Sequence, residues 1–204
     1  MNPQIRTMQM TDSVFVVVDT ETTGFENSRG ATVTQVAAVA VDVATGTFVS
    51  QGMVRIKITP KDIETFSKEA SDVQGWTPEI NETGLPLDTC REQFCAWFAG
   101  LPQVEGYVAH NAKFDKFFMM RLKFAFPAHP WYCTRAGMKA AERLGKTPLF
   151  INHKLGTLAK ACGFVPASAH QALDDTLACA NGFQWLRSLG VPVQDMMIAT
   201  AFAR

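Results

Sequence analysis

Short hydrophobic stretches in the first part of the chain predict strands. Residues 14–18 form a β-branched apolar run, which is typical of a strand buried on both faces of a sheet. Two further strand-like stretches span residues 33–43 and 47–58, and the turn-like residues 44–46 lie between them. Because this connection is short, we expect the second and third strands to form an antiparallel hairpin.

The rest of the chain alternates between helical and strand-like patterns. Residues 59–86 show little periodicity and predict a long loop with room for one helical turn. Helical spacing of apolar residues recurs in five segments, 87–100, 112–124, 135–144, 154–162 and 171–189, and two segments are strand-like, 104–109 and 131–133. Strands followed by helices that alternate with strands indicate an α/β fold with a mixed sheet and helices on its faces.

The composition fits a folded domain. The 204 residues are 47% hydrophobic and 19% charged, so we expect a single domain over residues 1–204 with a core of about residues 13–190. The chain opens without an apolar stretch long enough for a signal peptide, and no run of eighteen apolar residues follows. We therefore expect a cytoplasmic location and no membrane contact.

Charge and cysteine content narrow the function classes. The formal net charge is zero, but residues 1–100 hold 7 basic and 13 acidic residues and residues 101–204 hold 12 and 6. This asymmetry permits a basic surface in the second half, and scattered solvated charges would explain it too. The five cysteines show no CxxC or Cys/His spacing, which argues against a disulfide framework or a zinc finger.

Two acidic residues directly follow the first predicted strand. In an extended segment the side chains of Asp19 and Glu21 point to the same face and converge. Carboxylates this close repel unless a cation or proton intervenes, and Mg²⁺ or Mn²⁺ are the hard ions that prefer such oxygen ligands. An ordinary acidic turn after a strand would contain the same residues.

Two later segments carry further acids. In the segment from His110 to Asp115, Asn111 fits a helix N-cap, and an acid in the first helical turn also suits the helix dipole without any catalytic role. The segment from His170 to Asp175 places a histidine at a helix start, where it would accept a proton from water or cap the helix. Asp174 and Asp175 follow, and either would also suit a solvated helix face.

The three segments together resemble a known family. Asp19-x-Glu21 followed by Thr-Thr-Gly, His110-Asn-x-x-Phe-Asp115 and His170-x-Ala-x-x-Asp175 resemble, in order, the motifs of the DEDDh (DnaQ-like) 3′→5′ exonucleases. The resemblance implies an RNase H-like mixed five-stranded sheet flanked by helices. It also implies removal of nucleotides from the 3′ ends of single-stranded or frayed DNA by two-metal-ion phosphodiester hydrolysis.

Matched by position, the motifs assign a catalytic role to each of five residues. Asp19, Glu21, Asp115 and Asp175 would be metal ligands, and His170 would be the general base. Asp174 would then lie outside the metal site. Two Mg²⁺ or Mn²⁺ ions about 3.5–4 Å apart would activate the attacking water and stabilise the leaving 3′ oxygen.

The same resemblance implies a set of substrate-binding residues: Thr22, Thr23, Gln74, Trp76, His110 and Phe114. Residues 73–77 resemble the family's HGIT segment, but Gln74 stands where His is common and Trp76 where Ile or Leu is usual. Burial in the core would also explain Trp76 and Phe114, although an aromatic ring can stack on any base. The two departures concern substrate preference, not the chemistry.

Two other functions fit the same residues. One is an exonuclease acting on RNA or oligoribonucleotides, because discrimination depends on contacts to the 2′-hydroxyl that the motifs do not reveal. The other is a proofreading module whose main task is binding a polymerase, although all five catalytic positions are present. Homodimerisation is a further hypothesis, which rests on the family resemblance and the aromatic content.

Overall fold

Five strands form one mixed sheet in the order β3-β2-β1-β4-β5. The computed structural model describes residues 12–25, 27–28, 30–125, 128–167 and 171–198. The strands are β1 (Ser13–Thr22), β2 (Val33–Asp42), β3 (Phe48–Arg55), β4 (Gln103–Ala109) and β5 (Trp131–Cys133). The pairs β1–β2 and β2–β3 are antiparallel, whereas β1–β4 and β4–β5 are parallel. The predicted mixed α/β sheet and its hairpin are confirmed.

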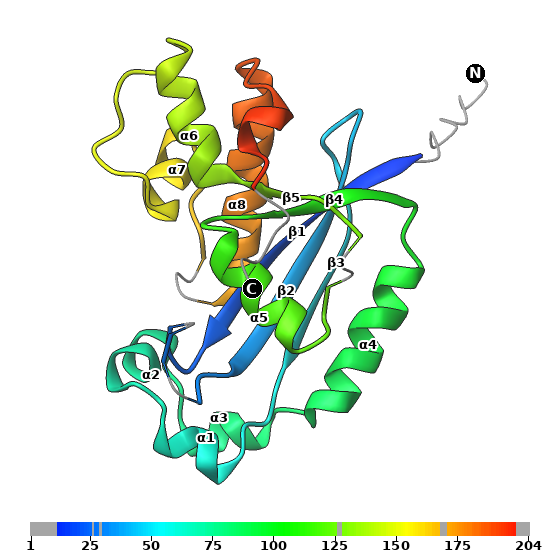
Figure 1. Cartoon of the computed structure of the whole chain (residues 1–204), viewed down its shortest axis with the longest axis vertical. Helices are drawn as coiled ribbons and strands as arrows, with labels where there is room; N and C mark the ends of the chain where they lie inside the picture. The colour runs from blue at the N-terminus through cyan, green and yellow to red at the C-terminus, as the bar shows by residue number, and fades with distance from the viewer. Residues whose placement is uncertain (1–11, 26, 29, 126–127, 168–170, 199–204) are drawn as a thin grey trace, which may run out of the picture.

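Helices cover both faces of this sheet. They are α1 (Pro60–Glu64), α2 (Lys68–Gln74), α3 (Pro78–Glu82), α4 (Leu87–Ala99), α5 (Lys113–Arg121), α6 (Thr134–Arg143), α7 (Leu155–Ala161) and α8 (Ala172–Ser188), followed by a 3₁₀ turn at Val193–Met196. Figure 1 shows α6, α7 and α8 together at the top of the view and the short helices α1 to α3 at the bottom. Within the described ranges, no helix has the length and apolar character needed to span a bilayer.

Strand β1 lies at the centre of the sheet and separates two hydrophobic clusters. Val14, Val16 and Val18 pack in one cluster with Phe94 of α4 and Phe118 of α5. The alternate residues Phe15 and Val17 pack in the other, with side chains from α6 and α8. Because side chains alternate along a strand, residues 19 and 21 continue the α8 face and residue 20 continues the α5 face.

The strand is longer than its apolar run predicts. It continues past Val18 to Thr22, and each residue of this extension pairs with β2, up to Thr22 opposite Val33. Asp19 and Glu21 therefore lie within β1 and not after it. The backbone pairing holds them extended, so their side chains are fixed on one face.

The prediction of a long loop over residues 59–86 was wrong, because three short helices occupy most of it. Helices α1, α2 and α3 begin after Thr59, Ser67 and Thr77, and each of these side chains accepts a hydrogen bond from a backbone N–H of the first turn. Helices of five to seven residues are too short to show hydrophobic periodicity. Their sequence signals are the capping residues, reinforced by proline at the first helical position of α1 and α3.

The start and end of α5 also differ from the prediction. Asn111 does not cap the helix; it adopts a φ of 63°, a left-handed conformation that asparagine tolerates better than most residues. Ala112 is the N-cap, without a side-chain hydrogen bond. The helix ends at Arg121, three residues before the predicted end, because Lys123 has a φ of 61°.

Candidate active site

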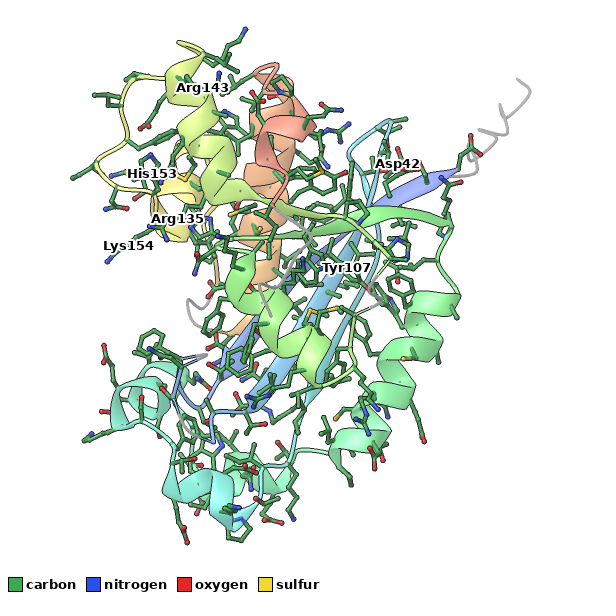
Figure 2. All side chains as sticks on the ribbon, viewed as in Figure 1. Asp42, Tyr107, Arg135, Arg143, His153 and Lys154 are labelled. Atoms are coloured by element: carbon green, nitrogen blue, oxygen red, sulfur yellow. The ribbon has the colours of Figure 1, made fainter. Side chains whose placement is uncertain are left out.

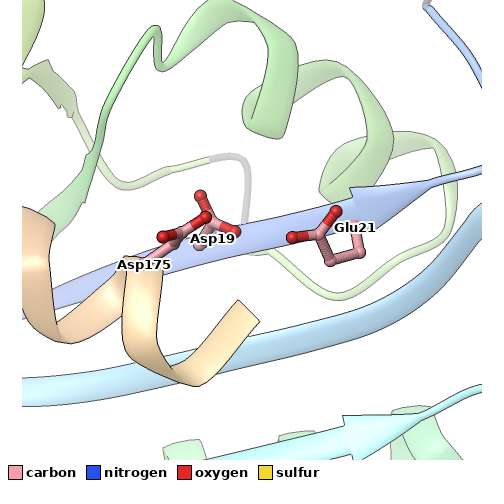
Figure 3. A group of neighbouring side chains, drawn as sticks. All are labelled: Asp19, Glu21 and Asp175. Atoms are coloured by element: carbon pink, nitrogen blue, oxygen red, sulfur yellow. The ribbon is translucent and has the colours of Figure 1, made fainter. Parts of the chain in front are cut away.

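Three carboxylates meet where β1 passes the first turn of α8. Oxygen atoms of Asp19, Glu21 and Asp175 all lie within 4.8 Å of one another. Figure 3 shows Asp19 and Glu21 projecting from the strand and Asp175 reaching toward them from the helix. Asp174, one residue earlier on α8, is not a member of this cluster. Helical geometry therefore selects Asp175 from the pair.

Asp115 reaches the site from the other side of β1. It is 2% exposed, and its Oδ1 accepts hydrogen bonds from the backbone N–H of Thr20 (3.0 Å) and from the Thr20 hydroxyl (2.9 Å). Thr20 faces α5, so it ties the acid of that helix to the strand that carries Asp19 and Glu21. Sequence reasoning missed Thr20, although the alternation of β1 places its side chain on that face.

Burial and mutual repulsion disfavour the charged forms of these acids. Burial raises the pKa of Asp19 well above its usual value, and the neighbouring Asp115, Glu21 and Asp175 raise it further. Burial also raises the pKa of Glu21 to about 8, with the charges of Asp175 and Asp115 adding to the effect. The pKa of Asp115 rises to about 7 through burial, against the lowering effect of its hydrogen bonds from Thr20.

Such a site fits divalent cations. A cation between the carboxylates would compensate both the lost hydration and the repulsion, and carboxylate oxygens are the ligands that Mg²⁺ and Mn²⁺ prefer. Within the described residues, no donor makes a hydrogen bond to the carboxylate of Asp19 or Glu21. The donor set is therefore suited to hold metal ions between β1, α5 and α8.

An open cavity of about 660 Å³ lies beside the acids, between the end of β1 and α2. Of the predicted substrate-binding residues, Thr22, Gln74 and Phe114 line it. Phe25, which is 68% exposed, and Lys154 also line the cavity, and both were missed. Lys154 follows a stretch without periodicity, so its sequence gives no signal of this position.

Two further predicted substrate-binding residues, Thr23 and Trp76, contact other residues of the protein. Thr23 is fully buried, and its hydroxyl accepts a hydrogen bond from the N–H of Thr32. Trp76 packs against Phe66, with 5.1 Å between ring centroids. Neither residue is among the lining of the cavity.

Gln74, at the end of α2, contacts three other elements at the edge of the site. Its Nε2 donates to the carbonyl of Thr22 (2.7 Å), and its Oε1 accepts from the hydroxyl of Thr34 (2.8 Å). Its own carbonyl accepts from Nε2 of Gln171, the N-cap of α8 (3.2 Å). The side-chain amide of Gln74 thus fixes α2 against β1 and β2, and its backbone carbonyl joins α2 to the start of α8.

The two predicted histidines differ in what the structure shows of them. His110 lies at the end of β4 with both ring nitrogens in hydrogen-bonding contact, Nδ1 with the hydroxyl of Thr134 (2.9 Å) and Nε2 with the carbonyl of His153 (3.0 Å). His170 lies outside the described residues. It precedes Gln171 in the sequence and is five residues before Asp175.

A mixed sheet with acids gathered from its central strand and from helices on both faces defines a nuclease of the RNase H-like class. The family described as Exonuclease (RNase_T) matches residues 16–183, so the chain belongs to this exonuclease family, of the DEDDh type. It is a nuclease that hydrolyses phosphodiester bonds, and metal dependence is general in this family.

Solved structures with the same fold include nucleases that bind different nucleic acids. Cell-death related nuclease 4 is 21% identical with a TM-score of 0.69, over 87% of this chain and 64% of its own length. Exonuclease X in complex with 5′ overhanging duplex DNA is 22% identical with a TM-score of 0.65, over 92% of this chain and 99% of its own. A 3′-exonuclease that recognises the 3′ end of histone mRNA stem-loop is 14% identical with a TM-score of 0.68, over 95% and 69%. No curated protein sequence gave a significant match.

Proposed function

We propose that this protein is a 3′→5′ exonuclease that removes nucleotides from single-stranded or frayed DNA ends by two-metal-ion hydrolysis. The observation that carries the proposal is the meeting of Asp19, Glu21 and Asp175 beside an open cavity, with Asp115 held next to them. The carboxylates of Asp19, Glu21 and Asp175 would repel a phosphodiester unless cations lie between them and the phosphate. A cavity of this size has room for a terminal nucleotide.

Each proposed catalytic residue has a defined task. Asp19, Glu21, Asp115 and Asp175 would hold the two Mg²⁺ or Mn²⁺ ions, which when bound polarise the phosphate and lower the pKa of the attacking water. His170 would take the proton of that water as the general base. Thr20 would keep Asp115 directed at the site through its two hydrogen bonds.

The cavity walls favour an unpaired 3′ end. Phe114 on α5 and the exposed Phe25 are the aromatic side chains of the described lining, and an aromatic face stacks on any base without reading its sequence. The backbone at Thr22 and Thr23 would contact the terminal nucleotide. Gln74, Trp76 and His110 would shape its surroundings through the contacts they make inside the protein.

RNA is the second candidate substrate, because one structural neighbour is a 3′-exonuclease that recognises histone mRNA. The two substrates differ at the 2′-hydroxyl. Oligonucleotides that carry one ribonucleotide at the 3′ end of a DNA strand, or one deoxyribonucleotide at the end of an RNA strand, separate these candidates. A DNA exonuclease would remove the terminal deoxyribonucleotide faster in both backbones.

A gel assay tests the proposed activity. The wild type, Asp19→Ala and the control Asp12→Ala, which changes an exposed acid just before β1, are incubated with 5′-labelled single-stranded DNA, duplex DNA and RNA in Mg²⁺, Mn²⁺ or EDTA. We expect a ladder that shortens from the 3′ end with the wild type and control, in metal only. Equal products from Asp19→Ala, or products in EDTA, would contradict the proposal.

Three expectations from the sequence stay predictions: homodimerisation, association with a polymerase and the cytoplasmic location. A light-scattering mass equal to one chain would rule out the homodimer. Activity of the purified chain without added protein would favour a free-standing enzyme over a proofreading module.

A further inference from the structure

His110 is joined to the protein through both nitrogens of its ring. The carbonyl of His153 only accepts hydrogen bonds, so Nε2 carries the proton. Burial lowers the pKa of His110 to about 4, so the ring is neutral at pH 7 and Nδ1 accepts from the hydroxyl of Thr134. This ring therefore ties the end of β4 to the segment that leads into α7.

A second set of hydrogen bonds fixes the same segment. Glu142 on α6 accepts from the backbone N–H of Phe150 (2.6 Å) and contacts Nε2 of His153 (3.0 Å). Oδ1 of Asn152 accepts from the N–H of Lys154 (3.0 Å) and from the hydroxyl of Thr157 (2.7 Å). Residues 150–154 lie between two helices without regular structure, and these contacts hold their backbone in place.

The segment carries Lys154 to the wall of the cavity beside the acids. Figure 2 shows Lys154 near His153 and Arg135, on the side of the α6–α7 region that faces the short helices. The described lining has three ionisable side chains, Glu21, Glu69 and Lys154. Lys154 thus supplies the positive charge of a wall that is otherwise acidic.

A nucleic-acid strand entering this cavity brings a negative phosphate with every nucleotide. Metal ions at Asp19 and Glu21 would neutralise the scissile phosphate, but the neighbouring phosphates would still face Glu69 on α2. A lysine ammonium is a compact point charge with three donors, suited to a phosphate that rotates or slides. Lys154, the basic residue of the described lining, therefore favours one path for the strand.

We propose that Lys154 binds a backbone phosphate of the strand in this cavity, and that His110 is the positioning residue that holds the Lys154 segment there. This inference rests on the proposed function and deepens it. His110 acts through the carbonyl of His153, so its contribution to substrate binding depends on Lys154. The ligand is defined by its chemistry: a phosphodiester close to the 3′ end of a single strand.

Fluorescence anisotropy with a 5′-labelled oligothymidylate tests the contact. Binding is measured with Ca²⁺, which binds oxygen ligands at longer distances than Mg²⁺ does. A gel checks that the strand stays intact. We expect Lys154→Met to weaken binding roughly tenfold at low salt and to lower the slope of log K against log salt by about 0.7, the loss of one single-strand phosphate contact. The control Lys160→Met, on an exposed lysine of α7, would match the wild type.

A methylphosphonate, which removes the charge of one linkage, identifies the phosphate. Placed at the first, second or third linkage from the 3′ end, it should weaken binding of the wild type at one of these positions and leave Lys154→Met unaffected at that same position. If Lys154→Met retains the affinity and salt slope of the wild type, or loses affinity equally at every methylphosphonate position, the contact does not exist.

Two variants of His110 test the positioning role. Glutamine places its amide nitrogen near the position of Nε2 and keeps a donor for the His153 carbonyl, whereas asparagine is too short to reach it. We expect His110→Asn to reproduce the lowered salt slope of Lys154→Met without adding to it in the double variant, and His110→Gln to restore most of the affinity. Additive effects, or a normal slope in His110→Asn, would overturn this role. Absence of binding by the wild type itself would instead refute the proposed function.

Discussion

The polar groups of the site fall into two regions that differ in where their partners are. In the first region, Asp19 and Glu21 meet Asp175, and their carboxylates are disfavoured as anions by burial and repulsion. In the second region, both polar atoms of the Gln74 side chain are bonded to other protein atoms, at 2.7 and 2.8 Å. Asp115 lies between the two regions, because its Oδ1 accepts hydrogen bonds from Thr20 while the carboxylate is also a proposed metal ligand. The two regions lie side by side around β1, but only the first requires something from outside.

This difference distinguishes residues expected to act in catalysis from residues expected to stabilise the fold. Polar groups bonded to other protein atoms serve the fold, whereas carboxylates gathered in a site where burial and repulsion raise their pKa values indicate a functional site. Substitution in the first region should therefore remove activity while leaving the fold intact or more stable. Substitution in the second region should cost stability or alignment. The following experiments test that division.

The largest effect is expected at Asp175. Asp175→Asn removes a proposed metal ligand worth several kcal/mol of transition-state stabilisation, so kcat should fall on the order of a thousandfold. Asp174→Asn changes the neighbouring acid, outside the cluster, and should retain activity within a few-fold. Steady-state cleavage of labelled single-stranded DNA measures both. A larger loss in Asp174→Asn would exchange the roles of the two residues.

Metal binding should stabilise the first region next most strongly. Mn²⁺ at about a hundred times its Kd would raise the free energy of unfolding by about 2.7 kcal/mol. Burial and repulsion raise the pKa of Glu21 from 4.5 to about 8 in the folded protein, so without metal the folded state binds more protons than the unfolded chain in this window. The stability that these acids contribute is therefore fully present below pH 4.5 and is lost as the pH rises toward 8.

Asp19→Asn provides the matched comparison for this pH dependence. Without metal, the variant should be more stable than the wild type at pH 8 and equal to it near pH 4, because a protonated aspartate and an asparagine are both neutral. Urea unfolding in EDTA at the two pH values, repeated with Mn²⁺, gives the result. Equal stability of the two proteins at pH 8 would show that the acids are not destabilised in the fold.

Gln74 is expected to show the opposite behaviour, because its bonds are internal. Gln74→Leu removes two hydrogen bonds and leaves the carbonyl of Thr22 and the hydroxyl of Thr34 without this partner, at a cost of about 2 kcal/mol of unfolding free energy. Gln51→Leu, on the exposed side of β3, is the control and should change stability by about 0.5 kcal/mol or less. A neutral Gln74→Leu would place this residue with the ligand-binding groups.

The smallest effect is expected at Thr20, at the boundary of the two regions. Thr20→Val keeps the shape and the backbone donor but removes the hydroxyl bond to Asp115, so kcat and the affinity for the more weakly bound Mn²⁺ should each fall about tenfold. Thr20→Ser retains the donor and should restore both. Mn²⁺ titration followed by electron paramagnetic resonance is independent of turnover. Equal losses in both variants would indicate packing and not alignment.

The first region was predictable from the sequence, and much of the second was not. An apolar strand followed by acids at positions i and i+2 fixes a shared face for Asp19 and Glu21. The choice of Asp175 over Asp174 rests on the resemblance to the family's third motif, and the structure brings Asp175 to the other two acids. The capped helices between residues 59 and 86 depend on single side-chain hydrogen bonds, which hydrophobic periodicity does not register. The position of Lys154 depends on contacts from Glu142 and His110, which are distant in sequence. A local sequence pattern therefore does not predict that Lys154 lines the cavity.

The order in which the acids occur along the chain has a consequence for biosynthesis. Asp19 and Glu21 leave the ribosome early, whereas Asp175 on α8 follows after all five strands have been made. A chain that stops before α8 therefore contains Asp19, Glu21 and Asp115 but lacks Asp175, and a structured domain generally forms as a unit. A nascent or prematurely terminated polypeptide would be harmless to the nucleic acids around it, and hydrolytic power would arise only when α8 docks on the sheet.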